Sequence, residues 1–207
     1  MKKNDPEFTK HLDLGCGLLP RNPYNAPSCY GIDIREIDDN LTQLNFQYVK
    51  ANLITEKIPY SDNFFDSVSA FDFLEHVPRQ LILANGELSN PFIELMNEIY
   101  RVLKPNGKFL ALTPVYPHPS AFVDPTHVNF ITTKTHEYFT GINPSGAMYG
   151  FNGNFECLQA KLETPKNIYR ANDFLMRKIL RKISRVLFNG GISHILWEFC
   201  ANKPVIK

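Results

Sequence analysis

The fold of this chain is decided by His11-Leu12-Asp13-Leu14-Gly15-Cys16-Gly17, a short strand that runs into a Gly-x-Gly turn. Glycines lack side chains, so the backbone of such a turn can approach a ligand closely. A second predicted strand, Gly31-Ile32-Asp33-Ile34, ends in a carboxylate, at about the 20-residue distance at which nucleotide folds bind ribose hydroxyls. Together the two features indicate an adenosine site. The alternative is that Asp13 and Asp33 only cap turns.

Short apolar runs bounded by turn residues alternate with longer segments, which is typical of a mostly parallel sheet flanked by helices. The best helix follows Pro91, where apolar side chains recur every three or four residues as far as Leu103. Residues 104–107 are expected to end it, because they contain proline and glycine. The expected strands lie near residues 11–15, 29–34, 46–52, 65–73, 108–115, 155–163 and 194–202.

The connection between the first two strands is unusual for such a sheet. Pro20, Pro23 and Pro27 leave no run long enough for a crossover helix, so we expect a loop or at most a single turn. A dinucleotide needs the exposed amides of a helix N-terminus for its pyrophosphate, and Pro20 stands where the third glycine of the dinucleotide fingerprint belongs. A nicotinamide-dependent dehydrogenase is therefore disfavoured.

S-adenosylmethionine is the adenosine cofactor that suits these residues. It has no phosphate, so it needs no helix N-terminus. Its sulfonium and ammonium favour acidic side chains at strand ends, which are Asp13, Asp33, Asp72 and Glu75. The sequence thus predicts S-adenosylmethionine as cofactor, with S-adenosylhomocysteine as product.

From residue 12 to residue 115 the ordered motifs resemble the class I S-adenosylmethionine-dependent methyltransferases, in particular their small bacterial members. Residues 12–17 are similar to the family's first motif and residues 31–34 to its second. Phe73-Leu74-Glu75-His76-Val77 resembles the segment after the fourth strand, and residues 101–107 the turn before the fifth. The resemblance implies an α/β fold: a Rossmann-like, doubly wound, seven-stranded, mostly parallel sheet with a degenerate first crossover helix and an antiparallel last strand.

The resemblance also implies which residues bind the cofactor. Gly15 and Gly17 would lie against its methionine end, and Asp33 would accept the ribose hydroxyls. The expected cofactor-binding residues are Asp13, Gly15, Cys16, Gly17, Asp33, Ile34, Asn52, Leu53 and Phe71.

Four of these positions would surround the adenine and the methionine moiety. Ile34 and Leu53 would sandwich the adenine, and Phe71 would flank the methionine. Asn52 would reach the adenine amino group; the family more often has Asp there, but an amide oxygen can also accept this hydrogen bond. For Ile34, Leu53 and Phe71, plain core packing is the alternative.

The loop after the fifth strand offers residues for the methyl acceptor, because it leaves the carboxyl edge of the sheet, where open α/β folds bind ligands. A hydroxyl acceptor benefits from a general base. We expect His127 to be this base, oriented by Asp124, with Glu75 and His76 lining the same mouth. The alternative is that Asp124 and Thr126 satisfy loop amides and His127 packs as a neutral side chain.

Residues 166–190 carry seven basic side chains against the single acid Asp173. Apolar residues interleave with them at near-helical spacing, which predicts a basic amphipathic helix. Such a helix, over residues 170–188, can contact anionic lipid; the alternative is that its apolar stripe packs on the sheet. The sequence argues against nucleic acid as a partner, because the cluster has no interleaved exposed aromatic residues.

Length and composition fit one globular domain: 207 residues, 43% of them hydrophobic and 21% charged, with a formal net charge of +1. We expect a single methyltransferase domain over residues 1–207, with a basic helical insertion at about residues 166–190. The four cysteines are scattered, so no metal set is expected from them. No signal peptide or membrane-spanning stretch is evident, which favours the cytoplasm, with the inner membrane face as a peripheral location.

The sequence therefore predicts an enzyme that methylates a hydroxyl of a small-molecule or glycan acceptor, such as a lipid-linked or surface-polysaccharide sugar. The alternative is a non-catalytic methyltransferase-fold subunit that uses its basic helix as an interaction surface. Binding of S-adenosylmethionine distinguishes the two.

Overall fold

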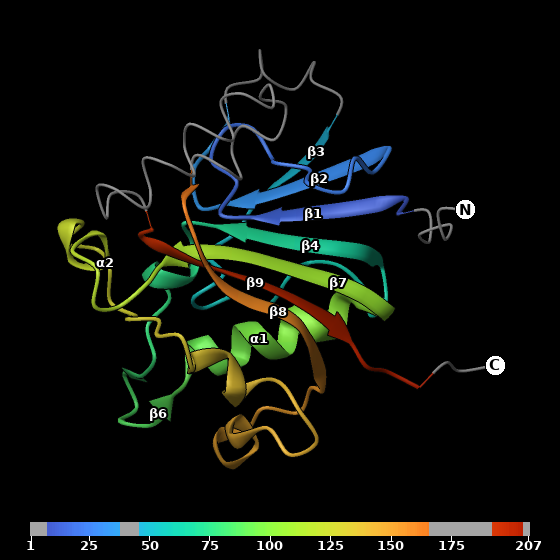
Figure 1. Cartoon of the computed structure of the whole chain (residues 1–207). Helices are drawn as coiled ribbons and strands as arrows, with labels where there is room; N and C mark the ends of the chain where they lie inside the picture. Colours follow the sequence, from blue (N-terminus) through green and yellow to red (C-terminus); the bar gives the residue numbers. More distant parts are fainter. Residues whose placement is uncertain (1–7, 38–45, 166–191, 205–207) are drawn as a thin grey trace, which may run out of the picture.

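Seven strands form one sheet at the centre of the computed structural model, which describes residues 8–37, 46–165 and 192–204. The sheet order is β3-β2-β1-β4-β7-β9-β8, and only β9 runs against its neighbours (Figure 1). The strands are β1 (Lys10–Leu14), β2 (Ser28–Asp33), β3 (Phe46–Lys50), β4 (Phe65–Phe71), β7 (Leu103–Pro114), β8 (Phe155–Glu163) and β9 (His194–Ala201). The expected α/β class, with its antiparallel last strand, is confirmed.

Each predicted strand forms, but β7 begins five residues before the expected start. Leu103 already pairs with Phe65 on β4, and the register shifts before Ser67 pairs with Lys108. Asn106 adopts a φ of +63° within this irregular stretch. Residues 104–107, which were expected to form a turn between the helix and the strand, thus belong to the start of β7.

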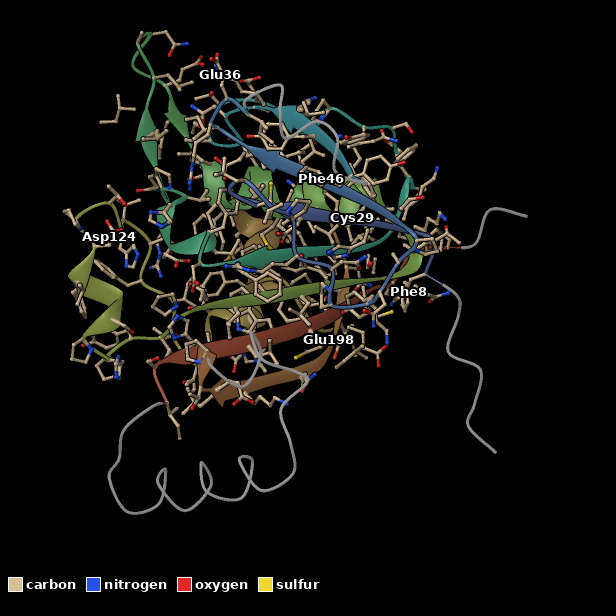
Figure 2. The ribbon with its side chains drawn as sticks, turned by 90° about the horizontal axis from the view of Figure 1, so that it is seen from above. Phe8, Cys29, Glu36, Phe46, Asp124 and Glu198 are labelled. Carbon is tan, nitrogen blue, oxygen red and sulfur yellow. The ribbon has the colours of Figure 1, made fainter. Side chains whose placement is uncertain are left out.

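The carboxyl ends of the parallel strands gather the loops that carry the candidate residues. The short α2 (Ser120–Val123) lies at the edge toward which the arrowheads of β1 and β2 point (Figure 1). Seen from above, Asp124 lies at one end of the sheet and Phe8, before β1, at the other (Figure 2). The short helix η2 (Leu74–His76) follows β4 at the same edge as α2.

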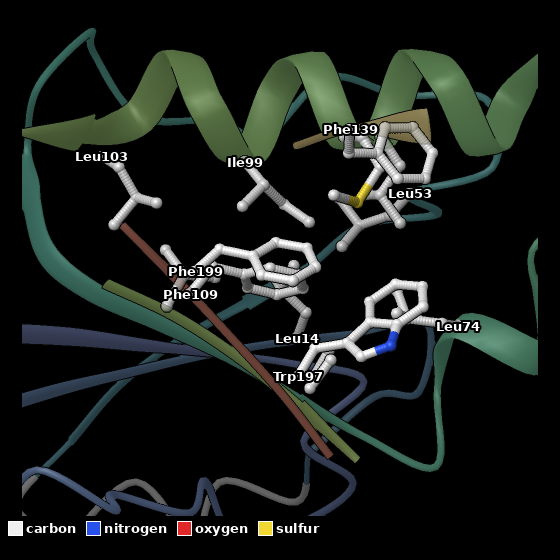
Figure 3. Close-up of a cluster of buried hydrophobic side chains, with 14 of the residues drawn as sticks. Leu14, Leu53, Leu74, Ile99, Leu103, Phe109, Phe139, Trp197 and Phe199 are labelled. Carbon is white, nitrogen blue, oxygen red and sulfur yellow. The ribbon is translucent and has the colours of Figure 1, made fainter. Parts of the chain in front are cut away.

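One face of the sheet packs against α1 (Pro91–Val102), the long helix of the described residues. Pro91 occupies its first turn, where the missing N–H is not needed. Buried side chains of α1, such as Ile99, face Phe109 of β7 and Phe199 of β9 (Figure 3). This layer forms the main hydrophobic core and fixes the positions of the central strands.

The chain between β1 and β2 is a loop, as its prolines predicted. Its turn is closed by Asn22, whose side chain accepts a hydrogen bond from Ala26 N–H and donates one to Ala26 C=O. Tyr24 Oη donates to Glu198 of β9 at 3.0 Å. These contacts hold the loop on the sheet face opposite α1, because side chains alternate between faces along a strand.

A small hairpin of β5 (Leu81–Ile82) and β6 (Leu88–Ser89), and two short helices, η3 (Thr135–Tyr138) and η4 (Ser145–Tyr149), complete the described elements. The predicted basic helix lies outside the described residues. No helix in the described ranges is long and apolar enough to cross a membrane.

Candidate cofactor and acceptor site

The register of the four strands β3-β2-β1-β4 brings the predicted cofactor-binding residues to one edge. Asp13 pairs with Gly31 on one side and with Ser69 on the other. Past the strand ends, Gly17 N–H donates to Asp33 Oδ2 at 2.8 Å. The glycine turn and the second carboxylate, which lie sixteen residues apart in the sequence, therefore touch.

The two glycines of the turn both adopt a φ that favours glycine, +61° at Gly15 and +63° at Gly17. A Cβ at Gly15 would lie 2.5 Å from the ring of Phe73, so this glycine is also required by packing. A Cβ at Gly17 would meet only Arg35, at 3.9 Å. Gly17 thus borders open space, as a backbone that receives a ligand must.

Asp33 is buried, with 6% of its surface exposed. Its carboxylate accepts Gly17 N–H and, at Oδ1, the Arg35 backbone N–H at 3.1 Å and the Arg35 Nε at 3.2 Å. A carboxylate offers about four acceptor positions, so one remains for a hydroxyl. The arrangement is suited to a ribose edge that enters beside Gly17.

The residues predicted to surround an adenine differ in their exposure and hydrogen bonding. Ile34 is 59% exposed, whereas Leu53 is 7% exposed and belongs to the core. Asn52 Oδ1 accepts Ile54 N–H at 3.1 Å. Ile34 therefore offers an apolar surface to a ring, while Asn52 is committed in part to its own turn.

Asp13 faces the protein interior rather than the open space at Gly17. It is 1% exposed; Oδ1 accepts the Ser69 hydroxyl at 2.6 Å and Oδ2 accepts Arg21 N–H at 2.7 Å. Burial raises its pKa to about 7. Ser69 also contacts His11 Nε2 at 2.9 Å, so Asp13 ends a buried polar chain that anchors the proline-rich loop.

Cys16 and Phe71 are also buried among neighbouring side chains. Cys16 Sγ occupies the space that a Cβ on Gly31 would need, at 2.6 Å, and burial raises the pKa of its thiol to about 12. The guanidinium carbon of Arg21 lies 4.9 Å from the centre of the Phe71 ring. One Arg21 nitrogen is 3.3 Å from the Phe71 carbonyl oxygen, so the loop covers this strand end with a cation.

On the acceptor side, Glu75, His76 and His127 come together between η2 and the loop after α2. Glu75 Oε2 accepts the Thr113 hydroxyl at 2.9 Å, whereas Oε1 is buried with no hydrogen-bond partner in the described ranges. His127 Nε2 lies 4.0 Å from Oε1. The two histidine rings meet edge to face, with centroids 4.8 Å apart. Burial raises the pKa of Glu75 to about 7.

The Asp124 carboxylate does not bond to the ring of His127, although the Asp124 carbonyl accepts the His127 backbone N–H at 3.1 Å. Asp124 Oδ1 instead accepts Thr126 N–H at 2.8 Å and the Thr126 hydroxyl at 2.7 Å, because an Asp side chain readily bonds to backbone two residues on. Thr126 Oγ1 lies 3.0 Å from His76 Nδ1, and His127 Nδ1 lies 3.2 Å from the carbonyl of Ala121. Asp124 therefore positions His76, through Thr126.

Sequence reasoning assigned no role to His194, which the structure places at the same edge. It opens β9, and because β9 is antiparallel, His194 pairs with Pro114 at the end of β7. Its Nε2 lies 3.0 Å from Asp72 Oδ1, and its Nδ1 2.7 Å from Ser193 Oγ. The antiparallel last strand was the signal that could have indicated this position.

A cavity of about 640 Å³ lies beside the cluster of Glu75, His76 and His127, between the start of α1 and residues 132–139. Arg79 joins the two, because its Nε donates to Asn129 Oδ1 at 2.8 Å and Asn129 N–H donates to the Glu75 carbonyl at 2.9 Å. The cavity lining includes Arg79, Phe92, Lys134, Tyr138, Phe139 and Tyr149. It combines an apolar floor with aromatic and cationic side chains.

Comparisons with known proteins concern the family and the fold. A family model described as a methyltransferase domain matches residues 12–111. The YcgJ protein of Bacillus subtilis is 17% identical, with a TM-score of 0.55 over 97% of this chain and 95% of its own. An S-adenosylmethionine-dependent methyltransferase of Mesorhizobium loti is 14% identical, with a TM-score of 0.56 over 95% and 93%.

A geranyl diphosphate C-methyltransferase of Streptomyces coelicolor, solved with Mg²⁺, geranyl diphosphate and S-adenosyl-L-homocysteine, is 15% identical. Its TM-score is 0.55, over 93% of this chain and 72% of its own. A search of curated proteins finds no match. The structural similarities, all at low identity, concern the fold.

Proposed function

We propose that this chain, whose residues 12–111 match a methyltransferase-domain family model, is a class I S-adenosylmethionine-dependent methyltransferase that methylates a hydroxyl of a small-molecule or glycan acceptor. The observation that carries the proposal is the buried Glu75 Oε1, which has no partner in the described ranges and faces His127 Nε2 at 4.0 Å. A buried acceptor atom without a donor is costly unless a ligand supplies one. An acceptor hydroxyl that gives its proton to His127 Nε2 creates an imidazolium, a charged donor that faces Glu75 Oε1.

The cofactor would be held by residues at the tips of β1 and β2. Gly17 leaves room for its backbone to be approached, Asp33 keeps an acceptor position for a ribose hydroxyl, and Ile34 presents an apolar surface. When bound, S-adenosylmethionine supplies a methyl group on a sulfonium that an oxygen nucleophile can displace. Asn52, Leu53 and Phe71 remain proposed cofactor contacts beside these three residues.

The acceptor hydroxyl would lie between Glu75 and His127. His127 Nδ1–H is held by the carbonyl of Ala121, which leaves the lone pair of Nε2 toward Glu75 and free to take the hydroxyl proton. Buried Glu75 Oε1 would stabilise the imidazolium that results. The rest of an acceptor molecule could extend into the cavity near Arg79 and Tyr138.

We further propose that the whole chain is one domain. The strands at its two ends support this, since β1 and β9 belong to the same sheet. We also propose that the protein lies in the cytoplasm and contacts anionic lipid through the predicted basic helix.

Calorimetric titration with S-adenosylhomocysteine tests the cofactor site. We expect binding by the wild type and a 10- to 100-fold weaker affinity for Asp33→Ala, since a hydrogen bond to a charged group contributes about 1.5–3 kcal/mol. Asp62→Ala is the matched control, because Asp62 is exposed and pairs with Arg101 far from the site. An absence of binding by the wild type would favour the non-catalytic alternative.

A screen of hydroxyl-bearing acceptors with a labelled methyl donor tests the reaction. For an acceptor that is methylated, His127→Ala should lower kcat by about 10²–10⁴, the usual contribution of a general base. His118→Ala serves as control, since His118 lies in the same loop but bonds to Ser120. Equal turnover by both variants would remove the role given to His127.

A further inference from the structure

We propose that Glu75, His76 and His127 form a binding site for a divalent transition-metal ion. One carboxylate oxygen and one nitrogen from each imidazole lie within 4.8 Å of one another. The hydrogen bonds around them, rather than this proximity alone, indicate a metal, because the described residues supply no hydrogen-bond donor to Glu75 Oε1 and engage both imidazoles through Nδ1.

The tautomer of His76 follows from the chain of bonds that begins at Asp124. The Thr126 hydroxyl donates its only hydrogen to Asp124 Oδ1, so in its contact with His76 Nδ1 the Thr126 oxygen can only accept. His76 Nδ1 therefore carries the proton. Its Nε2 is left with a free lone pair.

The tautomer of His127 follows in the same way. Its Nδ1 faces the carbonyl oxygen of Ala121, which can only accept, so Nδ1 carries the proton and Nε2 carries the lone pair. That lone pair faces Glu75 Oε1, which is itself buried and has no donor in the described part of the chain. In metal sites, histidines are held in this manner, with the non-ligating N–H bonded to an outer carbonyl or side chain.

A single hydroxyl cannot bond to all three of these acceptor atoms. A hydroxyl has one hydrogen and satisfies one acceptor, whereas a divalent ion satisfies all three. Two imidazoles and a carboxylate are a ligand set of Zn²⁺ and Fe²⁺ sites, which keep positions open for substrate; Mg²⁺ and Ca²⁺ prefer oxygen ligands. Bonds of about 2.0–2.2 Å place neighbouring ligands about 3.0–3.5 Å apart, so the widest separation, within 4.8 Å, would close by roughly 1–2 Å.

This inference concerns the same side chains as the proposed function and deepens it. With an ion present, the acceptor oxygen would bind at an open position of the metal, which lowers the pKa of the hydroxyl. His127 would then act as a ligand in place of the general-base role proposed above, and the hydroxyl proton would leave to solvent. The metal site itself can be tested without any acceptor.

The test uses the full chain, stripped of metal with a chelator and titrated with Zn²⁺ by calorimetry and with Co²⁺ by visible absorption. We expect saturable binding of one ion per chain, retained in the control His118→Ala and at least 100-fold weaker in His127→Ala and Glu75→Gln. Mg²⁺ should bind far more weakly than Zn²⁺. No saturable Zn²⁺ or Co²⁺ binding by the wild type, or equal binding by His127→Ala, would overturn the site.

The variant Thr126→Val is a second test of metal binding, and it changes an exposed residue rather than a buried one. It removes the acceptor that fixes His76 Nδ1–H, and we expect a 10- to 100-fold loss of Zn²⁺ affinity, as for other outer-shell partners. Unchanged affinity contradicts the tautomer argument. S-adenosylhomocysteine is titrated into the same preparations: if it binds where metal does not, the metal site alone fails, and if it does not bind, the proposed function fails.

Discussion

At the scale of single residues, the buried chain from His11 to Asp13 shows how polar groups are accommodated inside this sheet. Burial lowers the pKa of His11 to about 4 and raises that of Asp13 to about 7. His11 is therefore neutral, Ser67 donates to its Nδ1, and its Nε2–H donates to Ser69, which donates to Asp13. Every group in the chain has a partner, and the proline-rich loop is bonded to its end through Arg21 N–H.

Asp13→Asn should preserve the fold and change its pH dependence. The amide can reverse the chain, accepting Arg21 N–H and donating to Ser69. In the wild type, Asp13 has a folded pKa of about 7 against an ordinary value of 3.8, so between these pH values the folded state binds one more proton and stability falls as pH rises. Asn does not titrate, so the Asp13→Asn variant does not lose stability in this way. Its stability relative to the wild type should increase by up to about 1.4 kcal/mol per pH unit.

Urea unfolding of both proteins between about pH 5 and about pH 7 measures this difference. His11 is neutral in both over most of that range and contributes the same slope to each, so the difference isolates Asp13. A difference that stays flat with pH would mean that Asp13 is ionised in the folded protein.

Ile34 gives a prediction that separates ligand contact from packing. Its side chain is 59% exposed, so Ile34→Ala should change the free energy of unfolding by less than about 0.5 kcal/mol. If an adenine covers it, the loss of about 1 kcal/mol of apolar contact weakens S-adenosylhomocysteine binding about five-fold. Ile142→Ala, at 94% exposure, is the control that should alter neither quantity. Unchanged affinity in Ile34→Ala would remove Ile34 from the site.

At the scale of elements, the loop between β1 and β2 replaces a crossover helix and must be held by side chains. Tyr24 connects it to β9 through Glu198, which also accepts from Gln159. A double-mutant cycle with Tyr24→Phe and Glu198→Ala should give a coupling of about 0.5–1.5 kcal/mol in unfolding free energy. A coupling near zero would show that the loop is not bonded to the far side of the sheet in solution.

Element positions followed from the sequence where the signal is local. Pro20, Pro23 and Pro27 exclude a helix whatever lies around them, and the apolar spacing after Pro91 identifies α1 without knowledge of its partner. The early start of β7 could not be predicted, because it depends on the pairing of Leu103 with Phe65, 38 residues earlier in the chain.

The same distinction applies to the site. Gly17 and Asp33 were both assigned to the cofactor site, and they touch because both lie at the ends of adjacent parallel strands. The pairing of His194 with Asp72 bridges 122 positions, and no short motif encodes it. The Asp124 carboxylate bonds to Thr126, two residues on, rather than to the ring of His127, three residues on, so even a short spacing does not decide which neighbour a side chain contacts.

At the scale of the whole molecule, the sheet order joins both ends of the described chain into one layer. β9 lies between β7 and β8 and carries Trp197, which is fully buried and is the single tryptophan of the sequence. Its fluorescence therefore reports on the β7-β9-β8 half of the sheet. The other half holds Tyr30 on β2, packed edge to face against Tyr60, Phe64 and Phe65.

If the chain is one cooperative domain, both halves should unfold together. We expect the urea transition of Trp197 fluorescence to coincide with that of far-UV circular dichroism, as two-state unfolding requires. The variant Trp197→Phe with Tyr30→Trp moves the probe to β2, and its fluorescence and dichroism midpoints should again coincide, even though both substitutions lower the overall stability. Midpoints separated by more than about 0.5 M urea in either protein would exceed the error of such fits. They would show that the β3-β2-β1-β4 half, which carries the cofactor residues, folds independently of the strands that place His194 at the mouth.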